Sequence, residues 1–145
     1  AHAPEPLLFE PHEIVYIGVR DCDPYEIKRI EETGMLLFPR IRGCEDEILR
    51  AIGTHNHIHI SFDVDCLDES EMKNTGTVAA TKGLLAWDCF SLIRRIQTQP
   101  NWIHSFDLME YNEGVLDDEN SWNTMKYVIQ ETLAVCSLPD SIDFK

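Results

Sequence analysis

Short apolar runs rich in β-branched residues alternate along this chain with longer segments whose apolar residues recur at helical spacing. The first run, 14–19, is nearly continuous and is typical of a strand buried on both faces. Strands separated by helices predict a parallel sheet with right-handed crossovers and helices on both faces. We therefore expect an α/β fold with a three-layer α/β/α arrangement. The expected strands are 14–19, 35–38, 57–62 and 102–108, and the expected helices are 24–33, 45–52, 86–96 and 122–136.

Individual residues mark the ends of two expected helices, and mixed polarity marks a long loop. Asp23 is a suitable N-cap, Pro24 suits the first helical position, and Gly34 lies where this first helix would stop. The helix over 45–52 closes in the same way, on a glycine. Residues 67–84 have mixed polarity and predict a long loop, and loops of this length in compact domains are usually functional.

Size and charge limit the classes of protein that this chain can represent. Its 145 residues suit one compact domain, or part of a larger one, over 1–145. An excess of 26 acidic over 12 basic residues repels phosphate backbones and anionic lipid, so neither nucleic acid nor a membrane is an expected partner. The five cysteines are odd in number and form no C-x-x-C pair, which argues against a zinc cage and a secreted disulfide frame. We expect a reducing, cytoplasmic location.

An acidic motif, Asp63-Val64-Asp65, directly follows the third expected strand. Ligands of parallel sheets bind beyond the carboxyl ends of the strands, and residues two apart in extended chain point the same way. Asp63 and Asp65 should therefore enter one crevice, where their repulsion raises one pKa unless a cation lies between them. Oxygen ligands favour manganese, magnesium or calcium. Taken alone, the motif leaves open a metal site and a helix-capping or turn role for one carboxylate.

Three segments of the chain resemble the arginase and agmatinase (ureohydrolase) family. Residues 59–68, HISFDVDCLD, followed by NTGT at 74–77, are similar to the family signature S-F-D-V-D-x-L-D-P and its T-G-T loop. Residues 16–24, YIGVRDCDP, resemble Y-I-G-L-R-D-V-D-P, and residues 106–112, FDLMEYN, resemble D-I-x-E-V-N-P. The three segments keep the family order and cover most of the chain.

The resemblance implies that 1–145 is the C-terminal part of a single arginase-like domain. The implied activity is hydrolysis of a guanidino substrate, arginine giving ornithine and urea, at a centre of two manganese ions. Asp63 is then expected to bridge both ions and Asp65 to chelate one, while Glu110 binds the substrate guanidinium and Thr77 lies beside the metal pocket as a second substrate-binding residue. The family's remaining ligands, a histidine and a D-x-H-x-D motif, belong to an N-terminal half that this sequence lacks. No residue is assigned a further catalytic role.

Some positions depart from the family pattern. Glu69 and Glu113 each replace a proline, and residues 78–83 stand where the family has a proline and a Gly-Gly turn. These changes alter the expected pocket rim and leave open arginine, agmatine or another guanidino compound as substrate. They also leave open an alternative function, a metal-free, inactive arginase-like protein with a scaffold or regulatory role. In either case the family implies a homotrimer or hexamer, and we expect subunit contacts near the C-terminus, after Cys136.

Two other groups of residues receive structural interpretations. His55, His57 and His59 cluster before the acidic motif, and His57 and His59 alternate with isoleucines on a buried strand. We interpret the three histidines as packed, hydrogen-bonded residues rather than as metal ligands. Arg20 and Asp21 are interpreted as a structural ion pair at the end of the first strand.

Overall fold

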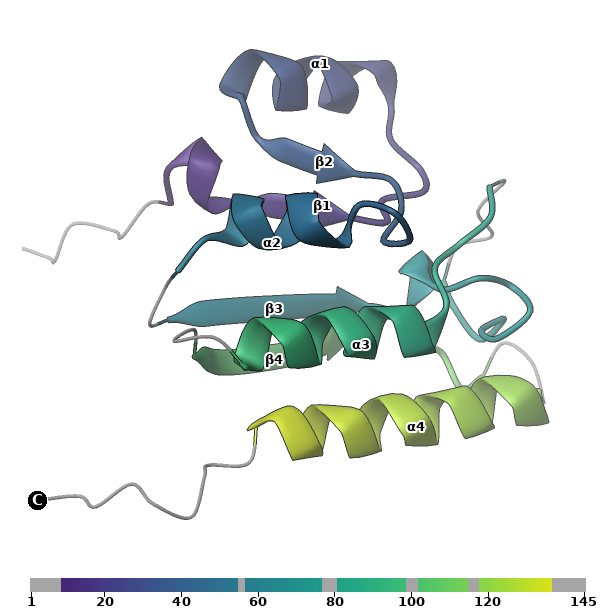
Figure 1. Ribbon diagram of the computed structural model, residues 1–145. Helices are drawn as coiled ribbons and strands as arrows, with labels where there is room; N and C mark the ends of the chain where they lie inside the picture. The colour runs from purple at the N-terminus through teal and green to yellow at the C-terminus, as the bar shows by residue number, and fades with distance from the viewer. Residues whose placement is uncertain (1–8, 55–56, 77–80, 99–101, 115–117, 137–145) are drawn as a thin grey trace, which may run out of the picture.

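The computed structural model describes residues 9–54, 57–76, 81–98, 102–114 and 118–136 (Figure 1). Strands and helices alternate through these residues as the sequence predicts, and the bounds expected for α1 and α2 match those observed. The elements in order are η1 (Pro11–Glu13), β1 (Val15–Ile17), α1 (Pro24–Thr33), β2 (Leu36–Phe38), α2 (Glu45–Ile52), β3 (Ile58–Asp63), η2 (Val64–Cys66), α3 (Ala86–Gln97), β4 (Ile103–Met109) and α4 (Glu119–Cys136).

The four strands form two parallel pairs. β1 pairs with β2, and β3 pairs with β4 in a register that sets Asp63 opposite Met109. Figure 1 shows β2 and β1 in the upper part of the molecule and β3 and β4 below them. The parallel direction is as predicted, but the described residues form two sheets of two strands rather than one continuous sheet, because no hydrogen bonds among them join the pairs.

The hydrophobic core lies against one face of the β3–β4 pair. Phe62 of β3 and Phe106 of β4 stack on Phe90 of α3, with ring centroids 5.5 and 6.4 Å away, and Tyr127 of α4 meets Phe90 edge-on at 5.9 Å. Such aromatic pairs stabilise a core beyond the area that they bury. α3 and α4 therefore cover the same face of this pair. None of the helices in the described ranges combines the length and the apolar character needed to pass through a bilayer.

The opposite face of β3–β4 carries exposed polar side chains. His59 contacts Ser105 Oγ through Nδ1 at 2.8 Å and Asp107 Oδ2 through Nε2 at 3.1 Å. The ring of His57 meets that of His104 edge-on at 5.0 Å. His59 is thus hydrogen-bonded as predicted, but the expectation that it packs in a buried strand is wrong for the described chain. Side chains along a strand point to its two faces in turn, and the described helices cover only the face that carries the apolar residues. His55 lies outside the described residues.

The expectation that the first strand is buried on both faces is also wrong for the described residues. Ile17 packs against the core, but Tyr16 is 37% exposed. No residue of α1 is buried. Because α1 leaves Tyr16 accessible, the apolar run predicts the strand correctly but not its surroundings.

Candidate functional site

The acidic motif forms a tight turn at the carboxyl end of β3. The strand ends at Asp63 and the chain enters η2, where the Leu67 amide donates to Val64 O at 3.2 Å. Asp63 Oδ1 accepts a hydrogen bond from the Asp65 amide at 3.0 Å. The sequence argument assumed extended chain through Asp65, which is wrong. A 3-10 turn, rather than the alternation of a strand, brings the two aspartates together.

Negative charge accumulates at this turn. Burial is the main cause that raises the pKa of Asp63, and the nearby carboxylates of Asp65 and Glu110 raise it further, while the hydrogen bond from the Asp65 amide opposes them. This agrees with the expectation that two adjacent aspartates here make ionisation of one unfavourable. A cation bound among these oxygens would stabilise the charged form of all three groups.

Glu110 lies at the same edge of the sheet as Asp63. It follows β4 directly, one residue beyond the Met109 that pairs with Asp63. Its φ of 64° is in the left-handed region, and Glu110 is the one non-glycine residue of the described ranges with a positive φ. Such strained backbone clusters at ligand-binding and active sites. The placement agrees with the prediction that Glu110 shares an edge with the two aspartates.

Gly76 lies against the end of the Glu110 side chain. A Cβ at Gly76 would lie 2.8 Å from Glu110 Oε2, closer than real Cβ contacts. The next residue, Thr77, is the second predicted substrate-binding residue, and it lies outside the described residues. The loop predicted over 67–84 therefore contacts the predicted substrate-binding carboxylate.

The base of this loop is held by main-chain contacts. Leu67 and Leu84 form a parallel bridge, and a Cβ at Gly83 would lie 2.3 Å from the carbonyl carbon of Leu67. Asp68 accepts hydrogen bonds from the hydroxyl and amide of Ser70 and from the amide of Gly83 at 3.1 Å, and these bonds lower the pKa of Asp68. The two ends of the loop are thus fixed to each other.

The middle of the loop is tied to the two helices that cover the core. Glu71 Oε2 accepts from the Ala86 amide at 2.7 Å and so caps α3, which has no side-chain cap from its own N-cap residue. Ser121 Oγ of α4 accepts from the amides of Lys73 and Asn74 at 2.8 and 3.3 Å. The segment after Glu110 joins this network, because the Asn112 amide donates to Asn74 O at 2.9 Å.

The carboxylates that converge here fit a hard divalent cation in the chemistry of their donors, since oxygen ligands suit manganese and magnesium. The described ranges nevertheless contain no group of three or more His, Cys, Asp or Glu side chains arranged to hold an ion by themselves. This part of the chain can thus contribute a share of a metal donor set, not a whole one. The metal roles of Asp63 and Asp65 and the substrate role of Glu110 stay predictions.

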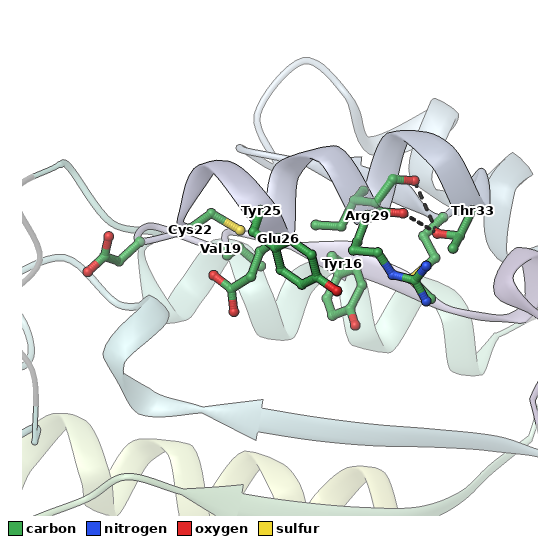
Figure 2. Close-up of a pocket in the computed structure, with 10 residues that line it drawn as sticks. Tyr16, Val19, Cys22, Tyr25, Glu26, Arg29 and Thr33 are labelled. Atoms are coloured by element: carbon green, nitrogen blue, oxygen red, sulfur yellow. Dashed lines mark hydrogen bonds between the residues drawn. The ribbon is translucent and has the colours of Figure 1, made fainter.

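A groove of about 290 Å³ lies elsewhere, between α1 and β1 (Figure 2). Tyr25, Glu26 and Arg29 of α1 border it, together with Tyr16 of β1. None of the converging carboxylates lines it. The groove reflects the exposed underside of α1, and the carboxylate cluster remains the candidate site.

Comparison with known proteins identifies the family. The model of the arginase family matches residues 1–134. The chain belongs to the arginase family. An arginase of Glaciozyma antarctica is 34% identical over 115 residues, which are 73% of this chain and 33% of that protein. The N(1)-aminopropylagmatine ureohydrolase of Thermus thermophilus is 40% identical over 76 residues, 49% of this chain and 25% of that protein.

Solved structures confirm the arginase-like α/β fold. Helicobacter pylori arginase superposes with a TM-score of 0.76 at 21% identity, covering 91% of this chain and 45% of that one. Entamoeba histolytica arginase, solved in complex with L-ornithine, superposes with a TM-score of 0.75 at 26% identity, covering 90% of this chain and 46% of that one. The chain thus spans less than half the length of these arginase-family relatives.

Sequence reasoning missed the contacts of one residue near the arginase-family motif. Arg20 was expected to pair with Asp21, but its guanidinium donates to the main-chain oxygens of Asp65 and Leu67 at 2.9 and 2.7 Å. The sequence shows that an arginine follows the first strand. It does not show which carbonyl groups the side chain can reach, because that depends on how distant segments pack.

Proposed function

We propose that this chain forms part of a manganese-dependent hydrolase that cleaves a guanidino compound to urea and an amine. The observation that supports it is the convergence of Asp63, Asp65 and Glu110 at one sheet edge in a chain of the arginase family. In this proposal the two aspartates supply carboxylate oxygens to a two-ion manganese centre. The remaining ligands come from the part of the protein that this chain does not include.

Each residue has a separate task in this proposal. When bound, manganese ions would lower the pKa of water and stabilise negative charge that develops on the substrate. Asp63 and Asp65 would hold the cations through their carboxylate oxygens, and a bound cation would offset the partial burial that raises the pKa of Asp63. Glu110 accepts charge-assisted hydrogen bonds from the planar guanidinium, for which a carboxylate is the complementary group. Its fixed left-handed backbone keeps this acceptor oriented before substrate arrives.

The test is a measurement of metal content and urea release by the full-length protein after manganese loading. Asp63→Ala should lower both to background, because a cation left with an incomplete oxygen shell binds weakly. Asp46→Ala is the matched control, since Asp46 contacts Arg95 at 2.7 Å on the surface of α2, and it should change neither quantity. Urea release that continues unchanged in Asp63→Ala would contradict the assignment. Arginine and agmatine, assayed in parallel, would identify the substrate.

A second candidate function is a metal-free arginase-like protein that acts as a scaffold or regulator. It is favoured by the exposed apolar side chains of α4, Trp122, Ile129 and Leu133, which form a surface that a partner could cover. Determining the full-length sequence distinguishes the two candidates. An intact D-x-H-x-D motif favours catalysis, and a substituted one favours the scaffold.

We also propose a homotrimer or hexamer in the cytoplasm. The exposed apolar residues of α4 support a subunit contact near the C-terminal end of the chain, although the predicted segment after Cys136 lies outside the described residues. The free cysteines of the described ranges agree with a reducing compartment. Sedimentation analysis of the full-length protein would test the assembly, and a strictly monomeric mass would contradict it.

A further inference from the structure

Three segments of the chain meet beside the acidic turn. They are the end of β1, the residues that follow η2, and the returning end of the loop over 67–84. Gly18 has a φ of 72°, and a Cβ there would lie 2.4 Å from Leu84 Cδ1. Gly83 in turn approaches the main chain of Leu67 so closely that a Cβ would lie 2.3 Å from its carbonyl carbon. The position of each segment therefore constrains the other two.

Arg20 spans this junction. Its Nη1 donates to the carbonyl oxygens of Asp65 at 2.9 Å and Leu67 at 2.7 Å. Its Nε donates to Thr81 O at 3.0 Å, and Nη2 reaches the same oxygen. The hydroxyl of Thr81 donates in return to Arg20 O at 3.4 Å. One side chain thus joins the end of β1 to both ends of the loop.

The guanidinium group suits this task better than any other side chain. It is planar, always charged, and presents several N–H donors in a fixed fork, so it can hold separate carbonyl oxygens at once. The oxygens of Asp65 and Leu67 lie within and just after the turn that carries the second aspartate. Fixing both oxygens limits rotation of the turn, and hence movement of the Asp65 carboxylate relative to Asp63.

We propose that Arg20 is a positioning residue for the acidic turn, acting through main-chain carbonyl oxygens rather than as a ligand. This inference rests on the proposed function, because the turn is taken to carry two metal ligands. It goes beyond that function by assigning the geometry of the ligand turn to a residue that follows another strand, β1, and lies 45 positions away from Asp65.

The experiment compares three variants of the full-length protein. Arg20→Gln removes the fork, Arg20→Lys keeps the charge, and Arg42→Gln is the matched control, because Arg42 Nε contacts Asp88 Oδ2 at 2.7 Å on the surface. Two quantities are measured. One is the rate of backbone hydrogen exchange over 63–68 in metal-free protein, and the other is the dissociation constant for manganese from calorimetry.

Arg20→Gln should accelerate exchange over 63–68 and weaken manganese binding about 10- to 100-fold, as loss of a group that orients metal ligands typically does. Arg20→Lys should lie between the wild type and Arg20→Gln, because an ammonium is a point charge without a fork. Arg42→Gln should leave both quantities unchanged. If Arg20→Gln does not fold, the Arg20→Lys variant provides the same two comparisons.

Two results would overturn the inference. Unchanged exchange over 63–68 would show that Arg20 does not hold the turn, whether or not manganese binds. Faster exchange with an unchanged dissociation constant would reduce Arg20 to an ordinary structural contact. A wild-type protein that binds no manganese would instead remove the proposed function, and the exchange rates would still decide whether Arg20 holds the turn.

Discussion

Two regions of this molecule bury apolar surface very differently. The first region, residues 9–38, contains β1, α1 and β2, and none of its hydrophobic side chains is fully buried. The second region, residues 41–136, contains β3, β4 and the helices that cover them, and it holds the whole buried core of the described residues. Both regions have the same alternation of strand and helix. A shared pattern therefore does not imply a shared degree of burial.

The candidate site lies mainly in the second region, whereas Arg20 reaches it from the segment between β1 and α1 in the first. Segments with few buried apolar contacts open locally at low free energy, so the first region should exchange its amide hydrogens faster than the second. The acidic turn and Glu110 are supported by the better-packed region, as a preorganised site requires. The following substitutions test this contrast.

The largest expected effect is that of Phe90→Ala. Phe90 is fully buried and contacts aromatic rings on both strands of the second region and on α4. Removing it leaves a cavity, and we expect the free energy of unfolding to fall by about 3–5 kcal/mol. Urea denaturation monitored by fluorescence would measure the change.

Tyr25→Ala is the matched aromatic truncation in the first region. Tyr25 is 70% exposed on α1, so its loss should change the free energy of unfolding by no more than about 0.5 kcal/mol. Equal losses in the two variants would contradict the contrast between the regions.

Particular residues show how far the sequence alone could lead. The start and end of α1 could be predicted because Asp23 accepts from the amides of Tyr25 and Glu26 and Gly34 adopts the left-handed conformation, both local effects. The acidic turn could be located from its motif. Local signals could not predict the exposure of Tyr16, because it depends on what lies over the sheet.

The finer geometry of the candidate site was equally beyond prediction. The backbone of Glu110 is left-handed although nothing in its residue type favours that conformation, so contacts made by the surrounding fold must maintain it. The hydrogen bond from Arg20 to the main-chain oxygen of Asp65 joins residues far apart in sequence. They come within reach only because three segments pack together.

A smaller effect is expected from Gly83→Ala at the base of the loop. The added methyl group would lie 2.3 Å from Leu67 C and 2.4 Å from Asp68 N, which are main-chain atoms that cannot move independently. The bonds between Asp68 N and Leu84 O and between Leu84 N and Cys66 O, both 2.8 Å, must then lengthen. We expect a loss of about 1–3 kcal/mol in thermal or urea unfolding.

Gly34→Asn is the control for this glycine in the first region. Apart from the neighbours of Gly34 in the chain, no heavy atom of the described residues lies within 4 Å of a Cβ built there, although its φ is 73°. Asparagine tolerates the left-handed conformation, so the free energy of unfolding should change by only about 0.5 kcal/mol or less. A larger loss at Gly34 than at Gly83 would mean that backbone conformation, not the close approach of segments, governs both positions.

The smallest expected effect concerns acid stability and Asp118, the residue that precedes α4. Hydrogen bonds from the hydroxyl and amide of Ser121 lower the pKa of Asp118. The folded state therefore binds a proton at Asp118 less readily than the unfolded state does. Above the ordinary pKa of 3.8, the charged carboxylate stabilises the fold. This stabilisation is lost as the pH falls through the lowered pKa of the folded state. Asp118→Asn keeps an oxygen that can accept the same bonds but does not titrate. We therefore expect nearly unchanged unfolding at neutral pH and a shallower loss of stability below about pH 4, measured as the urea midpoint against pH.

Asp23→Asn replaces the corresponding N-cap of α1, and because the first region contributes no buried core, it should leave the acid slope of the core transition as in the wild type. The contact of Ser121 with Lys73 and Asn74 means that the slope also reports on the loop beside the candidate site. If Asp118→Asn and the wild type lose stability with the same slope, protonation of other carboxylates controls the acid transition, and the α4 cap has no part in it.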